Sequence, residues 1–165
     1  MSTAVSDRIE KAVLLRAPLS RVWQALTDAS EFGKWFGVRL EGQFKAGTPI
    51  RGAITPTTVD PEVAKMQKPY EGMTFEIVID RIEPKTLFSF RWHPFGVDPK
   101  VDYSKEPMTL VEFTLQELPE GVHLKVIESG FDKVPIERRA QAFTANEGGW
   151  AAQMTLIEKY LAKAV

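Results

Sequence analysis

The stretch FTANEGGWAAQM, residues 143–154, lies within a segment whose apolar residues recur at the spacing of an α-helix. This helix is predicted to start near Pro135. The face predicted to point inward comprises Ile136, Ala140, Phe143, Glu147, Trp150, Met154, Ile157 and Leu161. Two adjacent glycines, Gly148 and Gly149, interrupt the helix at a cost of about 1 kcal/mol each relative to alanine. The one charge predicted on the inward face, Glu147, therefore sits beside the weakest point of the helix.

The chain before this helix alternates between apolar and polar residues, as antiparallel strands with one wet face do. The pattern predicts strands at 73–84, 86–93, 108–118 and 122–131, and a hairpin over 38–54. Alternation places the following side chains on the apolar faces: Phe75, Ile77 and Ile79; Phe88, Phe90 and Trp92; Val111, Phe113 and Leu115; Leu124, Val126 and Glu128. Glu128 is thus predicted to be a carboxylate on an apolar face.

The residue pattern in the first part of the chain predicts one strand, at 8–17, followed by two short helices. In the second helix, Asp28 followed by Glu31 resembles a capping box. Two long loops follow, at 55–72 and 93–107, and loops of this length in a compact domain are usually functional or disordered. In the first loop, Asp60-Pro61-Glu62 is a plausible helix start. Whether these loops close over a cavity is left open by the sequence.

Composition limits the classes of function. A length of 165 residues favours one domain over residues 1–165. The net charge of −1 and the scattered lysines and arginines argue against nucleic-acid partners. No apolar run approaches the ~20 residues that membrane insertion needs. The start, MSTAVSDRIEK, lacks the apolar core of a signal peptide, so a cytoplasmic protein is expected.

Cofactors and metals are not expected. The chain has no cysteine, which excludes disulfides and thiolate metal sites. Alternation predicts that both histidines, His93 and His123, face solvent, so no metal site is expected. The oligomeric state is left open between a monomer and a homodimer.

Three stretches carry a resemblance to a known family. APLSRVWQALTDASEFGKWFG (17–37) resembles the opening signature of the family related to the C-terminal domain of the activator of heat-shock-protein-90 ATPase, in the START-like (SRPBCC) superfamily. VIESGF (126–131) and NEGGWAAQMTLIEKYL (146–161) resemble its closing strand and helix. The resemblance, from about residue 9 to 162, implies a single α+β START-like domain with the helix-grip fold. In that fold a curved six-stranded antiparallel sheet surrounds a long C-terminal helix, with two short helices.

The resemblance also implies a ligand site, because the superfamily commonly holds an apolar small molecule between sheet and helix. The walls implied here are Trp35, Phe75, Ile77, Phe88, Phe90, Trp92, Val111, Phe113, Leu124, Val126, Phe143, Glu147, Trp150 and Met154. The alternative is that these aromatic side chains simply fill the core.

Three functions remain open at this point. The leading prediction is a binding protein for a small hydrophobic molecule, aromatic or polycyclic. The second is an enzyme of the cyclase or hydratase type with Glu147 or Glu128 as acid or base. The third is contact with a chaperone, against which the polar outward residues of the strands argue. For both carboxylates the alternative is structural: pairing with Arg39, Arg51 or Arg81, or a hydrogen bond from Tyr or Trp.

Overall fold

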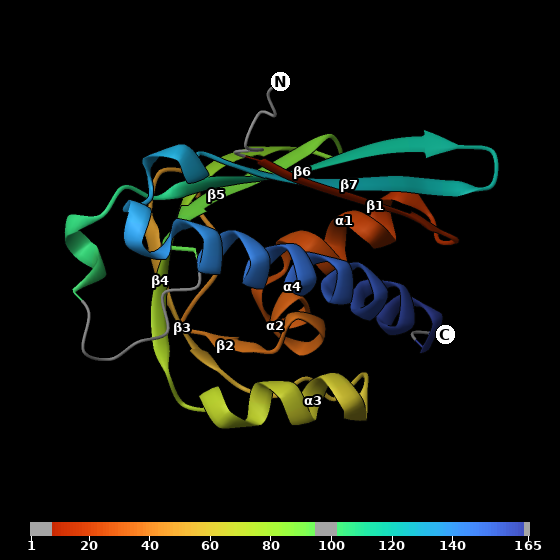
Figure 1. The fold of residues 1–165 in the computed structure, drawn as a ribbon. Coiled ribbons are helices and arrows are strands. Elements are labelled where there is room, and N and C mark those ends of the chain that lie inside the picture. Colours follow the sequence, from red (N-terminus) through yellow and green to blue (C-terminus); the bar gives the residue numbers. More distant parts are fainter. Residues whose placement is uncertain (1–7, 95–101, 164–165) are drawn as a thin grey trace, which may run out of the picture.

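A computed structural model describes residues 8–94 and 102–163 and shows a curved antiparallel sheet around a long C-terminal helix (Figure 1). The strands are β1 (Arg8–Leu15), β2 (Val38–Leu40), β3 (Pro49–Ile54), β4 (Thr74–Glu83), β5 (Leu87–Trp92), β6 (Thr109–Leu118) and β7 (Gly121–Ser129). Their order across the sheet is β1-β7-β6-β5-β4-β3-β2. The helices are α1 (Leu19–Thr27), α2 (Ala29–Phe36), α3 (Pro61–Gln67) and α4 (Ile136–Lys163), with short 3₁₀ helices η1 (Lys68–Tyr70), η2 (Tyr103–Lys105) and η3 (Phe131–Lys133). The predicted α+β helix-grip fold is confirmed.

The sheet has seven strands rather than the six expected. The seventh strand is accounted for by the hairpin predicted over 38–54, which is confirmed: the three residues of the edge strand β2 pair with β3 from Val38 opposite Ile54 to Leu40 opposite Gly52. Strand β2 follows α2 directly because Gly37 ends that helix in the left-handed conformation, with φ 96°. Glycine adopts this conformation without steric cost, so the chain reverses from helix to strand within one residue.

The two opening helices are tied to α4 by one carboxylate. Asp28 caps α2, and its side chain accepts a hydrogen bond from the Glu31 backbone N–H at 3.1 Å. The Glu31 side chain does not complete a capping box but accepts from Arg21 on α1 at 2.7 Å and from Tyr160 on α4 at 2.8 Å. Burial, followed by this hydrogen bond to Glu31, raises the pKa of Tyr160. The cluster therefore fixes how α1 and α2 lie against α4.

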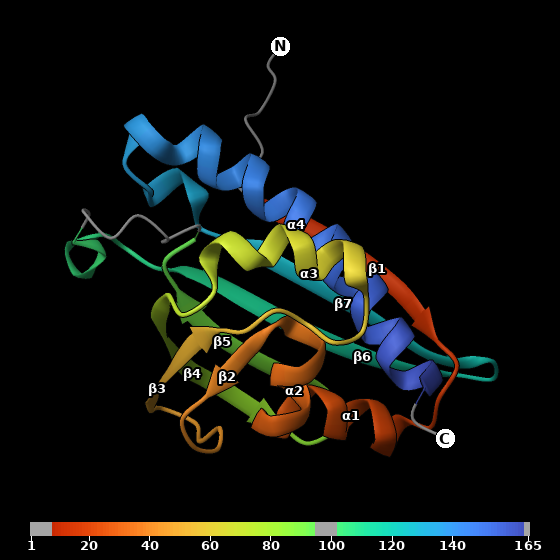
Figure 2. The same cartoon turned by 90° about the horizontal axis from the view of Figure 1, so that it is seen from below.

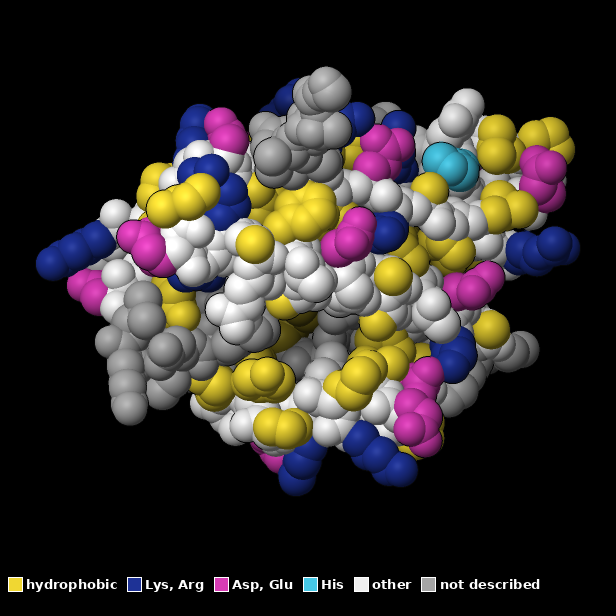
Figure 3. Space-filling model, in the orientation of Figure 1, with side chains coloured by type: hydrophobic (Ala, Val, Ile, Leu, Met, Phe, Trp, Pro, Cys, Tyr) yellow, Lys and Arg dark blue, Asp and Glu magenta, His cyan; other side chains and the backbone are white. Residues whose placement is uncertain are grey.

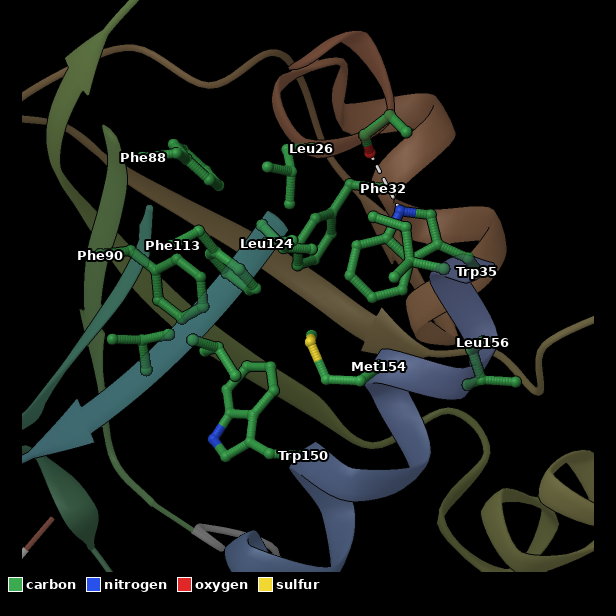
Figure 4. Close-up of a cluster of buried hydrophobic side chains, with 14 of the residues drawn as sticks. Leu26, Phe32, Trp35, Phe88, Phe90, Phe113, Leu124, Trp150, Met154 and Leu156 are labelled. Carbon is green, nitrogen blue, oxygen red and sulfur yellow. Dashed lines mark hydrogen bonds between the residues drawn. The ribbon is translucent and has the colours of Figure 1, made fainter. Parts of the chain in front are cut away.

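Aromatic side chains fill the space between the centre of the sheet and α4 (Figure 4). The ring of Phe113 lies edge-on to that of Trp150, with centroids 5.6 Å apart, and stacks on Phe88 at 6.2 Å. Trp35, fully buried, donates its indole N–H to the Ala25 carbonyl oxygen at 2.9 Å. Dense ring packing of this kind makes the centre of the molecule a core rather than a cavity.

Helix α3 lies across from α4, in front of it when the molecule is seen from below (Figure 2), and an ion pair from its cap joins the two helices. None of its residues is fully buried. Asp60 caps it by accepting from the Glu62 N–H at 2.9 Å, and its other oxygen pairs with Lys159 of α4 at 2.6 Å. This confirms the predicted helix start in the loop 55–72. In the other loop, residues 95–101 lie outside the described part of the chain.

Among the helices of the described residues, none is long and apolar enough to span a bilayer.

The Asp60–Lys159 pair predicts a pH dependence. The hydrogen bond from Lys159 lowers the pKa of Asp60 below its ordinary value of about 4. A carboxyl whose pKa is lowered by folding stabilises the folded state above its unfolded pKa, and this contribution is lost as the pH falls through the lowered pKa. Asp60→Asn removes the charge but keeps a good cap. Urea denaturation at several pH values should show the parent more stable than Asp60→Asn at pH 7. The two should converge toward pH 2, and a constant difference would contradict this account.

Two glycine-to-alanine substitutions should have opposite effects on stability. A Cβ at Gly33 in α2 would lie 2.2 Å from the Val38 carbonyl oxygen, so Gly33→Ala should cost at least about 2 kcal/mol. A Cβ at Gly148 in α4 would meet no atom within 4 Å, so Gly148→Ala should stabilise by up to about 1 kcal/mol. Urea denaturation measures both. A loss of stability in Gly148→Ala would show that the helix needs glycine there for packing.

Candidate functional site

The glycine pair of α4 faces a pocket. Gly148 and Gly149 both line a hollow of about 670 Å³ at the side of the molecule, between α4 and α3 (Figure 3). A Cβ at either position would have open space around it. Neither glycine is therefore required by close packing within the described residues, and both leave the pocket wider than any other residue would.

Several parts of the chain form the walls of the pocket. Helix α4 contributes one wall, and α3 with η1 contributes the opposite one. The floor comes from β4, β5 and the end of α2. The lining residues are Phe36, Gly37, Ile54, Val63, Met66, Gln67, Tyr70, Met73, Thr74, Phe75, Glu76, Trp92, His93, Tyr103, Ala145, Asn146, Gly148, Gly149, Ala152 and Gln153. Aromatic and aliphatic side chains predominate, with a few polar groups between them, which is the usual composition of a small-molecule site.

The amide side chains in the wall are oriented by the protein. Gln67 accepts from the Thr57 N–H at 2.8 Å and donates to the Phe36 carbonyl oxygen at 3.0 Å. Gln153 donates to the same carbonyl oxygen at 3.0 Å. A carbonyl oxygen can only accept, so the Gln153 amide must turn its nitrogen toward Phe36 and its Oε1 away. That Oε1 is buried and has no hydrogen-bond partner among the described residues.

Directly behind this wall lies Glu128, which is fully buried on β7. Four side chains donate hydrogen bonds to its carboxylate. Trp92 at 2.7 Å and Thr109 at 2.5 Å bond to Oε2, while Asn146 and Trp150, both at 2.8 Å, bond to Oε1. The prediction that Glu128 faces inward is confirmed. Its partners are two indoles, an amide and a hydroxyl rather than Arg39, Arg51 or Arg81.

The largest difference between the predicted and the observed site concerns the orientation of Glu147. Its side chain is 53% exposed and approaches Lys11 of β1 at 4.0 Å, so the predicted inward orientation is wrong. Residues 146 and 147 precede Trp150 by four and three positions, so at 100° per residue they flank its direction on the helix. The buried carboxylate of Glu128 decides between them, because Asn146 can donate to it and a second carboxylate cannot. Ile136, 70% exposed, and Ala140, also exposed, likewise lie off the buried face.

The structure brings only part of the predicted ligand-binding set to the pocket. Phe75 and Trp92 line it. Phe143 packs on Phe131 instead, with ring centroids 5.1 Å apart. The remaining members lie in the packed core and not on the pocket wall: Trp35, Ile77, Phe88, Phe90, Val111, Phe113, Leu124, Val126, Trp150 and Met154. The hollow is therefore displaced from the centre of the sheet to the side facing α3.

Sequence reasoning missed the residues that α3 and η1 contribute, among them Met66 and Tyr70. Their contacts depend on how the loop 55–72 folds against the rest of the chain, and the spacing of apolar residues in the sequence does not predict this. Two signals pointed to the region: the glycine pair and the length of the loop 55–72. His93, expected to face solvent, is half-buried at the pocket edge, with its Nε2 3.0 Å from the Glu106 carbonyl oxygen.

Comparison with solved structures supports the fold. DynU16, a protein of the dynemicin biosynthetic locus, shares 26% identity and a TM-score of 0.67; the match covers 96% of this chain but 48% of DynU16, so the chain spans about half of that protein. Protein MLL2253 from Mesorhizobium loti shares 20% identity with a TM-score of 0.69, covering 96% and 98% of the two chains. An Aha1 dimer from Colwellia psychrerythraea shares 14% identity with a TM-score of 0.66, covering 93% and 95%.

Sequence comparison gives the family. None of the curated proteins compared with the chain matches it significantly. The family described as "Activator of Hsp90 ATPase homolog 1-like protein" matches residues 16–162, nearly the whole chain. The resemblance seen in the opening helices, the closing strand and the last helix is thereby confirmed. This chain belongs to the family of activator of Hsp90 ATPase homolog 1-like proteins.

Proposed function

We propose that this protein binds a small, largely apolar molecule in the pocket between α4 and α3. The volume of about 670 Å³ lies within the range of small-molecule sites, roughly 300–1,000 Å³. Aromatic rings from three different elements, Phe36, Phe75 and Trp92, supply flat apolar surface. The similarity to DynU16, a protein of a biosynthetic locus, is compatible with a small organic molecule as ligand.

The glycine pair is the observation that carries this proposal. Gly33 needs to be glycine because a Cβ there would collide with the Val38 backbone. Gly148 and Gly149 have no such constraint, yet together they cost the helix about 2 kcal/mol relative to alanine. What they share is the pocket, whose α4 wall they leave without side chains. Space for a ligand accounts for both residues, and packing accounts for neither.

The alternative of acid–base catalysis receives no support from the two predicted carboxylates. Glu128 has both oxygens engaged by donors and is fully buried. Glu147 lies on the outer face near Lys11 and does not line the pocket. A general acid or base has to come within hydrogen-bond reach of the substrate. The structure accordingly favours a structural role for Glu128.

Chaperone contact stays a separate prediction, which a pull-down with the purified chaperone would test.

Filling the pocket from the glycine position should abolish binding without unfolding the protein. Gly149→Leu places a side chain in open space, so it should remove binding of N-phenyl-1-naphthylamine, an uncharged fluorescent probe, while leaving the urea midpoint unchanged or higher. Ala151→Leu is the matched control, since Ala151 is exposed on the same helix and does not line the pocket. Probe fluorescence measures both. Equal binding by the parent and Gly149→Leu would rule out this pocket as the site.

Glu128→Gln should destabilise the fold. The amide presents an N–H₂ group where the carboxylate accepted, so at least one indole N–H, of Trp92 or Trp150, loses its partner and faces another donor. The expected loss is about 2–4 kcal/mol, that of disrupting a buried polar network. Glu112→Gln, a half-buried glutamate on β6, should change stability by less than about 0.5 kcal/mol. Equal stability of both variants in urea would show that the carboxylate is dispensable.

A further inference from the structure

We propose that the pocket selects apolar molecules that carry a positive charge, such as a protonated amine or a quaternary ammonium, over apolar anions. This inference rests on the proposed function, because it specifies the chemical class of the ligand for that same pocket. Four independent features of the wall support it: its charges, the carboxylate behind it, the orientation of its amides and its aromatic faces.

No described residue that lines the pocket is a lysine or an arginine, and the one formally charged lining residue is Glu76. Arg51 stands directly opposite Glu76 on β3, on the same face of the sheet, but is not itself a lining residue. Four cations on the surrounding elements have an acidic partner: Lys65 with Glu62, Lys68 with Glu71, Lys159 with Asp60, and Arg138 with Glu106. An anionic ligand would find no charged donor among the described lining residues.

A second negative charge lies one side chain behind the wall. Trp92 and Asn146 both line the pocket, and both donate to the buried carboxylate of Glu128. Four donors converge on that group, which is the arrangement that an acceptor-only carboxylate requires. None of the four is a cation, so no ion pair within the described part of the chain compensates the charge. A charge inside the protein is screened less than one in bulk water, so its field extends to the pocket.

The side-chain amides of Asn146 and Gln153 use their nitrogens for hydrogen bonds within the protein, which fixes the direction of their oxygens. Asn146 directs its nitrogen at Glu128, and Gln153 directs its nitrogen at the Phe36 carbonyl oxygen. Both targets can only accept, so the amide oxygens point the other way. The Oε1 of Gln153 is itself buried and has no partner among the residues that the structure describes. A ligand with N–H donors complements the oxygen of Asn146, a lining residue, whereas a carboxylate would oppose it.

The aromatic rings supply the remaining attraction. Trp92 lies 6.0 Å from Phe36 and 6.3 Å from Phe75, measured between ring centroids, and all three line the pocket. The indole N–H of Trp92 is directed at Glu128, so the positive edge of that ring is used inside the protein. The faces of aromatic rings carry negative potential and attract cations, most strongly where water is excluded.

Three naphthalene compounds of similar shape test the inference: 2-naphthylmethylammonium, uncharged 2-naphthylmethanol and anionic 2-naphthoate. Isothermal titration calorimetry at pH 7 should show the ammonium binding about tenfold more tightly than the carboxylate, with the alcohol between them. Gly149→Leu should abolish binding of all three. Glu76→Gln should lower the ammonium-to-carboxylate ratio about threefold, whereas Glu117→Gln, an exposed glutamate on β6 outside the pocket, should leave it unchanged.

The outcomes separate the two proposals. If the carboxylate binds as tightly as the ammonium or more tightly, the charge selection is overturned and the pocket still binds apolar molecules. If none of the three compounds nor N-phenyl-1-naphthylamine binds the parent, the proposed function and this inference both fall. A ratio that Glu76→Gln does not change would overturn the part assigned to that residue.

Discussion

The carboxylate of Glu128 is the group on which the junction of sheet and helix depends. It is fully buried on β7 and collects donors from β5, β6 and two positions of α4. Removing a carboxylate from water costs several kcal/mol. Hydrogen bonds to a charged group return about 1.5–3 kcal/mol each, so every donor that is lost makes the burial of this carboxylate less favourable. The carboxylate therefore imposes one position of α4 relative to the sheet.

That constraint also creates the pocket. Two of the four donors, Trp92 and Asn146, form part of the pocket wall, so the bonds that join sheet to helix also hold the wall rigid. On the inner side of α4 the ring of Trp150 closes on Phe113 and fills the core. On the side facing α3 the helix bears only hydrogen atoms at Gly148 and Gly149. The same turn of α4 therefore packs against the core through Trp150 and leaves space for the pocket at Gly148 and Gly149.

The division of the site into predictable and unpredictable parts has a physical origin. Alternation along β7 correctly placed Glu128 inside, because side chains on a strand have a period of two and leave one choice of face. Helical spacing did not separate Asn146 from Glu147, since both lie within about 60° of the direction of Trp150. The pairing of Asn146 with Glu128, a contact across 18 residues of sequence, made that choice. Pocket residues from α3, such as Met66 and Tyr70, depend on a surface loop and left no periodic trace.

The sequence by itself determined the order of the elements, their apolar faces, the short helices with their caps at Asp28 and Asp60, and the membership of the family. These follow from local periodicity and capping, which act over a few residues. The tertiary structure decided that the centre is solid, that Glu147 faces outward and that the hollow lies beside the glycine pair. Those outcomes depend on which side chains meet across the gap between sheet and helix. Ring packing and the satisfaction of one buried carboxylate settle such contacts only when the whole chain is folded.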